Sequence, residues 1–524
     1  MTDRRPLVSL LALAVVAFAA GPPLHAATAA ATTADAGPTY ADVAPILAES
    51  CASCHRPNQI GPMSLLTYDE VRPWAKAIAR NVEDQRMPPW HADPDFGHFA
   101  NDRSLEPGEI ETIMSWVENG APQGDPAAAP TPPSFPDGVW QLGEPDLVVE
   151  LERVTVPGGN QDIFPKLIGR VMLPEDRWVQ AIEILPGNRK VVHHVIAFQV
   201  KGFNEPDPQG GWLGAWAAGT DPMVFPAGTG RLLQKGANIL ADMHYHPTET
   251  EETDVTRIGL HFADTEVPKE LVNIWVQNDG FEIPAGAKQH QVVSTYKVWQ
   301  SGKIMGLIPH MHYRGTDFKF TATYPDGRQQ VLLNVPRWDF NWQTNYQLAE
   351  PISVPAGTRI ECVAHYDNSA DNPVNPDPTK NVKFGLESYD EMMIGFVDFI
   401  ADEGVRLKEP QEIRTEVLHQ LGRSHPGEVY AVHAGRPEFL APLYLPRQGD
   451  GVFYVIFDGQ LHDARVRDIR WDGQSFQATV DGLNGAELPF AGKVGEGGAI
   501  ETTLGERSWT GMLYTPDSSS ASGL

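Results

Sequence analysis

The sequence predicts a multidomain, mostly β protein, in which a small all-α domain precedes two antiparallel β-sandwiches and a small C-terminal β region. Three observations predict this class. The 524 residues suit roughly three to four domains at about 150 residues each. Apolar residues follow a helical period over residues 40–125. Beyond Val139, short β-branched and aromatic runs alternate with Pro and Gly turns, which is typical of antiparallel sandwiches.

Residues 1–29 are predicted to form a secretory signal peptide. Arg4 and Arg5 precede an apolar run from residue 7 to residue 20, and small-residue cleavage sites follow. This run is shorter than the ~20 apolar residues that cross a bilayer, and no later segment approaches that length. We therefore expect a periplasmic or secreted protein that is soluble after cleavage and has no membrane span.

Three apolar stripes predict the helices of the all-α domain at residues 40–125. A helix presents residues three and four apart on one face, and each stripe has this spacing. Repeated prolines then predict a stiff linker at residues 126–144. The stripes are Val43, Ile46 and Leu47; Val71, Trp74, Ala75 and Ile78; and Ile110, Ile113, Met114 and Val117.

The rest of the chain divides into three β regions. Residues 145–275 and residues 276–402 are each long enough for one sandwich, and residues 403–524 form the C-terminal β region. In this last region, the runs VFYVIFDG and QLHDARVRDIRWDG alternate like hairpin strands that are joined by Asp-Gly turns. Because they match no catalytic motif, we expect a small β domain that packs on its neighbours.

Charge and cysteine content exclude two classes of protein. A formal net charge of −28 repels phosphate backbones, so nucleic acid is not an expected partner. The chain has 3 cysteines, Cys51, Cys54 and Cys362, which are too few for a disulfide framework.

The segment CASCH, residues 51–55, predicts covalent attachment of one c-type haem. Two thiols that are two residues apart can each bond one haem vinyl group, while His55 turns its imidazole onto the iron. A redox CxxC pair or half of a zinc site would use the same cysteines, but the chain has no second CxxC. With Cys51 and Cys54 assigned to the haem, Cys362 is a lone thiol.

The sixth iron ligand must come from further along the chain. Met87 in QRMPPW is our prediction, because its thioether lies on a proline-stiffened loop and would raise the potential of the iron. Met63, His91 and His98 compete with it. Through CASCH and MPPW, residues 40–125 resemble the class I cytochrome c family, which implies a haem-binding cytochrome c domain.

Histidines cluster in three apolar segments beyond residue 190, namely VVHHVI, DMHYH and IPHMH. His310 and His312 share one face of a strand, so they can reach the same metal ion. His193 and His194 point to opposite faces unless a β-bulge turns both inward. Imidazoles without cysteine suit copper or zinc, an added thioether favours Cu(I), and redox chemistry beside a haem favours copper.

The order HH, MHY, HMH and DEM resembles the copper type II, ascorbate-dependent monooxygenases over about residues 145–402. The resemblance implies two copper ions, one in each sandwich. His193, His194 and His244 would hold the electron-transfer copper, and His310, His312 and Met392 would hold the catalytic copper that binds O2. His246 could replace or assist His244. Core packing is the alternative for Met392 and Met393, and His365 is expected to be structural.

Departures from that family point to the substrate. Its peptide-amidating member binds a substrate carboxylate through an Arg, an Asn and a Tyr, whose positions here hold Ile308, Ile394 and Phe396. A buried carboxylate without such partners is costly, so we expect a small, neutral, apolar substrate. The predicted function is hydroxylation of a C–H bond with O2, with electrons that an external donor supplies through the haem. The alternative is a non-catalytic electron-transfer or copper-binding haem protein.

Overall fold

A computed structural model gives the fold. It describes residues 37–516, except residues 58, 136–138, 202–210, 218–219, 265–266, 268, 409, 436–439, 458–459 and 483–486. The predicted signal peptide at residues 1–29 lies outside the described residues. Among the helices that the structure describes, none has the length and apolar character needed to cross a membrane.

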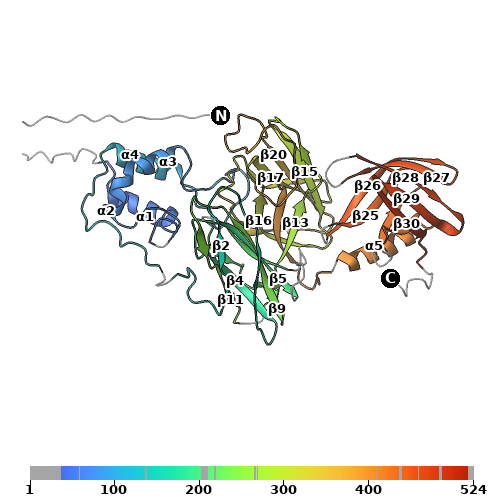
Figure 1. Cartoon of the computed structure of the whole chain (residues 1–524), viewed down its shortest axis with the longest axis horizontal. Helices are drawn as coiled ribbons and strands as arrows, with labels where there is room; N and C mark the ends of the chain where they lie inside the picture. The colour runs from blue at the N-terminus through green and yellow to red at the C-terminus, as the bar shows by residue number, and fades with distance from the viewer. Residues whose placement is uncertain are drawn as a thin grey trace, which may run out of the picture.

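The chain forms four parts, and the two β-domains lie beside each other between the other two (Figure 1). Short helices lie at one end, followed by a first β-domain (residues 147–271) and a second β-domain (residues 272–402) in the middle. A β-barrel with one packed helix lies at the other end. Strands make up 42% of the structure and helices 13%, so β-sheets determine the architecture.

The N-terminal part holds four short α-helices around a small core. The Asp42 carboxylate accepts a hydrogen bond from the Thr39 backbone N–H at 2.8 Å, which caps the first helix. Leu47, Ile113 and Trp116 are buried in the core between the helices. The elements are α1 (Tyr40–Ser50), α2 (Tyr68–Val71), η1 (Arg72–Trp74), α3 (Ala75–Glu83) and α4 (Pro107–Glu118).

The predicted all-α cytochrome c domain at residues 40–125 is wrong. Helices α1 to α4 hold 11, 4, 9 and 12 residues, and the described residues contain no sizeable all-α domain. The segment between α3 and α4 leaves the helices and packs on the second β-domain. There Trp90 contacts Tyr346 with ring centroids 4.9 Å apart, and Phe99 forms a β-bridge with Leu348. Helical periodicity does not reveal that a loop between helices is buried by a partner far along the chain.

Two sheets enclose the core of the first β-domain. One sheet has the order β1-β11-β4-β8-β12, with β7 paired to β4, and the other has the order β3-β9-β5-β6. Val195, Ile239 and Leu260 are fully buried between them. The strands are β1 (Leu147–Glu150), β3 (Lys166–Gly169), β4 (Arg177–Leu185), β5 (Val192–Lys201), β6 (Trp212–Ala217), β7 (Met223–Val224), β8 (Thr229–Leu233), β9 (Ala237–Tyr245), β11 (Arg257–Phe262) and β12 (Lys269–Glu270). A separate pair joins β2 (Val154–Val156) to β10 (Glu252–Asp254).

The second β-domain is built in the same manner. Its two four-stranded sheets have the orders β13-β22-β16-β19 and β15-β20-β17-β18. Because β13 pairs with β22, the boundary between the β-domains falls at residue 271, a few residues before the expected one. The strands are β13 (Val272–Gln277), β15 (His290–Lys297), β16 (Gly302–His310), β17 (Gly315–Thr323), β18 (Gln329–Val335), β19 (Tyr346–Val354), β20 (Arg359–Tyr366) and β22 (Ile394–Ala401). The short strands β14 (Glu282–Ile283) and β21 (Val382–Lys383) form a further pair.

A buried ion pair joins the two β-domains. Arg231 of β8 donates to Asp398 of β22 at 2.7 Å and to the Leu271 carbonyl at 3.1 Å. Asn273 donates to the same Asp398 oxygen at 2.7 Å. Because every one of these groups is buried, a relative movement of the domains would leave a charge without a partner. The pair therefore holds the two domains in one arrangement.

The C-terminal part is a closed barrel of eight antiparallel strands, which corrects the expected small β region. Closure leaves no free sheet edge, a property that strand periodicity alone does not predict. Asp463 pairs with Arg359 and Lys297 of the second β-domain at 2.8 and 3.3 Å. The elements are α5 (Pro410–Ser424), β23 (Val429–His433), β24 (Ala441–Tyr444), β25 (Gly451–Phe457), β26 (Gln460–Asp472), β27 (Ser475–Asp481), β28 (Glu487–Val494), β29 (Ala499–Leu504) and β30 (Arg507–Leu513).

Candidate metal centres

Strand pairing brings the three predicted histidines of the first β-domain together. His194 of β5 lies directly opposite His244 of β9. The register of this pair shifts between Val192 and His194, so His193 occupies a β-bulge. The bulge removes the strict alternation of side chains, and both adjacent histidines can turn toward His244.

The three imidazoles converge through their Nδ1 atoms. Nδ1 of His194 lies 3.2 Å from Nδ1 of His193 and 3.4 Å from Nδ1 of His244. One ligand nitrogen of each residue lies within 4.8 Å of the other two. Nitrogens that each bind one ion at about 2.0–2.1 Å are separated by roughly 3–3.5 Å. The cluster therefore fits a single metal ion with three imidazole ligands.

Asp162 fixes the imidazole of His244 through its Nε2 atom. Its carboxylate oxygens lie 2.8 Å from Nε2 of His244 and 2.7 Å from Nδ1 of His246. Burial raises the pKa of Asp162, but the hydrogen bonds from these two rings outweigh burial and lower it overall. A carboxylate that holds the outer nitrogen leaves Nδ1 of His244 for a metal. His246 contacts Asp162 and reaches His244 only through this carboxylate. Sequence reasoning missed Asp162 because no motif surrounds it.

Burial favours the neutral form of His193 and His194. Burial, followed by the nearby His244, lowers the pKa of His193 to about 3, and the same two causes lower the pKa of His194 well below its usual value. A neutral imidazole is the form that binds a metal ion.

The second cluster lies at the end of β16. The ring centroids of His310 and His312 are 5.4 Å apart. Nδ1 of His310 lies 2.6 Å from the Gln343 amide oxygen, which leaves Nε2 of His310 for a metal. Nδ1 of His312 is buried and has no hydrogen-bond partner among the described residues. Burial lowers the pKa of His310 to about 4 and the pKa of His312 well below its usual value.

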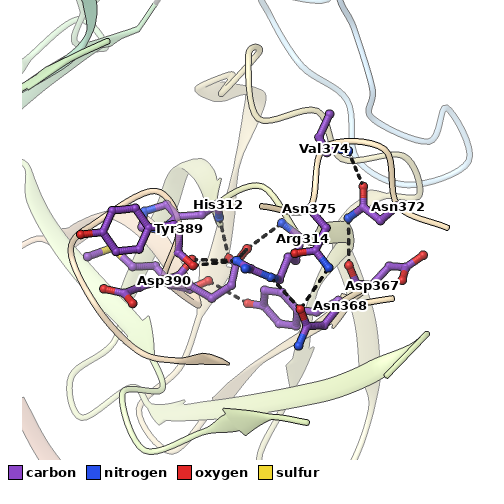
Figure 2. Close-up of polar contacts among 12 residues, drawn as sticks. His312, Arg314, Asp367, Asn368, Asn372, Val374, Asn375, Tyr389 and Asp390 are labelled. Atoms are coloured by element: carbon purple, nitrogen blue, oxygen red, sulfur yellow. Dashed lines mark hydrogen bonds and ion pairs between the residues drawn. The ribbon is translucent and has the colours of Figure 1, made fainter. Parts of the chain in front are cut away.

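A buried polar network ties the segment of Met392 to His312 (Figure 2). The fully buried Glu391 carboxylate accepts the backbone N–H groups of His312 and Arg314 at 2.8 and 2.6 Å. The Arg314 guanidinium donates to the Tyr389 carbonyl at 2.8 Å and to Asn368 at 2.9 Å. Burial raises the pKa of Glu391 to about 8, although the hydrogen bonds from the backbone N–H groups of Arg314 and His312 lower it. The network fixes the backbone beside Met392 against the HMH turn.

The two adjacent methionines have different surroundings. Met393 is fully buried in the core of the second β-domain, as the packing alternative expects. The Met392 carbonyl accepts a hydrogen bond from the Tyr366 hydroxyl at 2.8 Å, and its side chain is partly exposed. Met392 is therefore the methionine of this pair that is not part of the core.

The two clusters face each other across the domain interface. The rings of His194 and His310 have centroids 6.4 Å apart. Phe340 stacks on His193 at 4.5 Å and lies 6.0 Å from His312. The Ser388 hydroxyl of the second β-domain lies 3.3 Å from Nε2 of His244. Both candidate centres thus belong to one interface.

A cavity of about 240 Å³ opens beside both clusters. Its apolar wall includes Trp212, Ile308 and Phe396, two of which are positions where the family's carboxylate-binding groups are replaced. His194 and His310 also line it. Sequence reasoning missed Asn101 and Arg103, which reach the same cavity from the segment before α4. The Arg103 guanidinium is paired with Asp221 at the cavity wall.

The CASCH segment follows α1 in a series of turns, with Cys51 as the C-cap of that helix. Both thiols are free, and burial raises the pKa of Cys51 to about 12. Nδ1 of His55 is buried and has no hydrogen-bond partner among the described residues. A Cβ at Gly61 would approach this nitrogen to 2.6 Å, so the glycine leaves room for the ring. The donor set fits thioether attachment of a haem with an axial imidazole.

The candidates for the sixth iron ligand separate into two groups. Met63 packs against the helical core that contains Cys51. Met87 follows α3, with its N–H bonded to the Asn81 carbonyl at 3.2 Å. His98 belongs to the loop that packs against the second β-domain, where its carbonyl accepts the Ala349 N–H at 2.9 Å. His91 lies near Asp339 of the same domain. Met87 is still the prediction, with Met63 as its competitor.

Two other residues singled out in the sequence lie on β20. The His365 ring bonds to Asp317 at 2.7 Å, which fits the structural role expected for it. Cys362 is fully buried, where a Cβ at Gly395 would approach its sulfur to 2.5 Å.

Comparisons with known proteins add no functional information. No protein-family profile and no curated protein matches the chain. The PBSX exported protein XepA is similar with a TM-score of 0.14 and 10% identity, over 45% of this chain and 89% of that chain. The VP2 subviral particle of infectious bursal disease virus is similar with a TM-score of 0.15 and 10% identity, over 57% of this chain and 93% of that chain. TM-scores this low do not establish a shared fold.

Proposed function

We propose that the protein is a copper-dependent monooxygenase that hydroxylates a C–H bond of a small substrate, with electrons that enter through a covalently attached haem. The observation that carries this proposal is that His194 and His310, one from each cluster, line the same cavity. A substrate in that cavity would lie beside both candidate metal centres. A protein that only transfers electrons does not need such a cavity, so the cavity favours the enzyme over the electron-transfer alternative.

The two donor sets suit different tasks. Three imidazoles tolerate both Cu(I) and Cu(II), which suits the His193, His194 and His244 centre to electron transfer. Two imidazoles and a thioether favour Cu(I) and leave coordination positions open, which suits His310, His312 and Met392 to O2 chemistry. Bound copper would supply electron storage and the activation of O2.

The side chains around these ligands position and shield the reaction. Gln343 orients His310, and the Glu391 network fixes the turn that carries His312. Ile308 and Phe396 exclude water from the substrate carbon. The overall reaction is R–H + O2 + 2 e− + 2 H+ → R–OH + H2O. Each turnover therefore needs two electrons from an external donor.

We infer a neutral substrate of aryl or alkyl type. The positive charge nearest the cavity, Arg103, is already neutralised by Asp221. A substrate carboxylate would have to displace Asp221 or lie against an apolar wall, and either outcome costs free energy. Together with the predicted signal peptide, a c-type haem at Cys51, Cys54 and His55 supports a periplasmic or secreted location.

Metal analysis and isotope-labelled O2 test the proposal. Purified protein that is produced with copper and haem should hold two coppers and one haem per chain. His194→Ala and Met392→Ala should each lose one copper, whereas His365→Ala should keep both. Label from O2 should appear in the alcohol formed from a neutral aryl-alkyl compound such as ethylbenzene. Two zinc ions, or two coppers with no labelled alcohol from neutral compounds or peptides, would contradict the enzyme.

A further inference from the structure

We propose that the CASCH segment docks on the first β-domain so that electrons leave the haem near Cys54 and reach the three-histidine copper through the end of β6. This inference rests on the proposed function.

The loop that follows CASCH contacts the first β-domain through two arginines. Arg189, which precedes β5, donates to the Gln59 side chain at 3.3 Å. Arg56 donates to the Gln141 side chain at 3.4 Å. The Gln141 backbone N–H in turn donates to the Glu183 carboxylate of β4 at 2.7 Å. Arg189 therefore joins this loop to the first β-domain directly, and Arg56 does so through Gln141. The later loop of Trp90 and Phe99 packs on the second β-domain instead.

The Cys54 thiol lies near the same surface. Burial raises its pKa, and the charges of Arg103, Asp221 and Arg189 are close enough to act on it. Arg103 and Asp221 form the ion pair at the cavity wall. The Arg189 guanidinium also lies 5.9 Å from the ring centroid of Trp216 on β6. A haem bonded to Cys54 would therefore be attached at a residue that lies near the end of β6.

The end of β6 connects directly to a copper ligand. The Thr220 hydroxyl accepts the Ala217 N–H at 3.1 Å and donates to the Ala217 carbonyl at 2.8 Å. Ala217 is the register partner of His194 on β5. Residues opposite each other on paired antiparallel strands have Cα atoms about 4.5–5.5 Å apart. Asp221, Thr220 and Ala217 thus form a path of covalent and hydrogen-bonded contacts, and its last step, from Ala217 to His194, is a contact between paired strands.

The redox step is a single-electron exchange. The haem iron is oxidised from Fe(II) to Fe(III), and the copper held by His193, His194 and His244 is reduced from Cu(II) to Cu(I). The external donor then returns the haem to Fe(II). Two such transfers supply the two electrons of one hydroxylation, and no proton or atom moves between the centres.

The first experiment locates the haem relative to each copper. His312→Ala leaves copper in the three-histidine centre, and His194→Ala leaves copper in the other. In each variant, with Fe(III) haem, the electron-spin relaxation of Cu(II) is measured by paramagnetic resonance. We expect faster relaxation in His312→Ala, because that copper lies nearer the haem. Equal relaxation, or faster relaxation in His194→Ala, would overturn the proposal.

The second experiment tests the docking arginine. Protein with Fe(II) haem and Cu(II) is prepared without O2 or substrate, and oxidation of the haem is followed by absorbance. Arg189→Met should slow this oxidation by about tenfold, which is about 1.4 kcal/mol of activation free energy. The matched control is Arg177→Met, since Arg177 also lies over an aromatic ring, Phe262, at 4.6 Å but belongs to β4.

The outcomes separate this proposal from the proposed function. An unchanged rate in Arg189→Met, with haem and copper contents and potentials preserved, would overturn the route while the monooxygenase stands. Fast transfer without any alcohol formation would support the route and contradict the enzyme. Wild-type protein without haem would overturn both. If Arg189→Met does not fold, the relaxation experiment, which leaves Arg189 unchanged, decides the question.

Discussion

The three histidines of the first β-domain come from two strands that pair directly, whereas His310, His312 and Met392 come from a strand end, a turn and a segment some 80 residues later. The first centre is therefore fixed by a β-ladder and one bulge. The second is fixed by a buried polar network around Glu391 and Arg314. This difference shows that two similar donor sets can depend on unrelated parts of the fold, so each should fail through different substitutions.

The largest expected effect comes from Arg314→Met. Arg314 is 2% exposed, so removal of the guanidinium leaves the Tyr389 carbonyl and the Asn368 amide oxygen without this donor. We expect the free energy of unfolding to fall by about 2–6 kcal/mol, at about 1–3 kcal/mol for each buried acceptor that loses its donor. Urea unfolding measures this loss, and copper analysis should show that the second centre loses its metal before the first. Arg328→Met is the control, because Arg328 lies on the surface and contacts Tyr324. Equal loss of copper from both centres would show that they do not depend on different parts of the fold.

Acid should destabilise the metal-free protein through its buried histidines. The pKa of His310 is about 4 in the folded protein, mainly because of burial, against 6.5 as its ordinary value. The unfolded chain takes up the proton first as the pH falls, so stability is lost between about pH 6.5 and pH 4. Through His310 alone, the free energy of unfolding should fall by about 2 kcal/mol between pH 7.5 and pH 5. Urea unfolding at both pH values measures this cost, and His310→Asn should reduce the pH dependence by that amount. An unchanged dependence would show that His310 is not held neutral.

Asp162→Asn should weaken the first centre selectively. Loss of the carboxylate removes the group that orients His244, and copper affinity at this centre should fall by at least about tenfold. Competition with a Cu(I) chelator measures the affinity. His246→Asn should have a smaller effect, since the His246 side chain is 55% exposed and contacts Asp162 from outside. An equal loss at the second centre would contradict the separate construction of the two sites.

The smallest expected effect on the metals comes from removal of the barrel. Its contacts with the second β-domain include Asp463, the Leu461 carbonyl, which accepts the Trp299 indole N–H at 2.8 Å, and the rings of His462 and Tyr454. None of these residues belongs to a candidate centre. Deletion of residues 405–524 should therefore leave both coppers bound, as measured by metal analysis. Loss of either copper would show that the barrel supports the metal-binding domains.

Local patterns predicted much of the candidate site. Ligands that are a few residues apart lie on one helix or strand, whose period determines their relative positions. Such ligands can therefore be recognised in the sequence, as with His310 and His312, His193 and His194, and the CASCH segment. The β character beyond Val139 followed from turn spacing for the same reason. The sequence also defined the condition for His193 and His194 to act together, namely a β-bulge.

Only the tertiary structure decided the features that depend on long-range register and packing. The bulge at His193 exists because β5 and β9 pair in one particular register. Asp162 reaches His244 across 82 residues, and Arg103 reaches Asp221 across 118. The loop of Trp90 leaves the helices because its apolar surface is buried better on the second β-domain. A sequence pattern records the period within an element, but it does not record which distant element will cover it. The all-α domain was therefore expected wrongly, and the closed barrel and the arginine at the cavity were not foreseen.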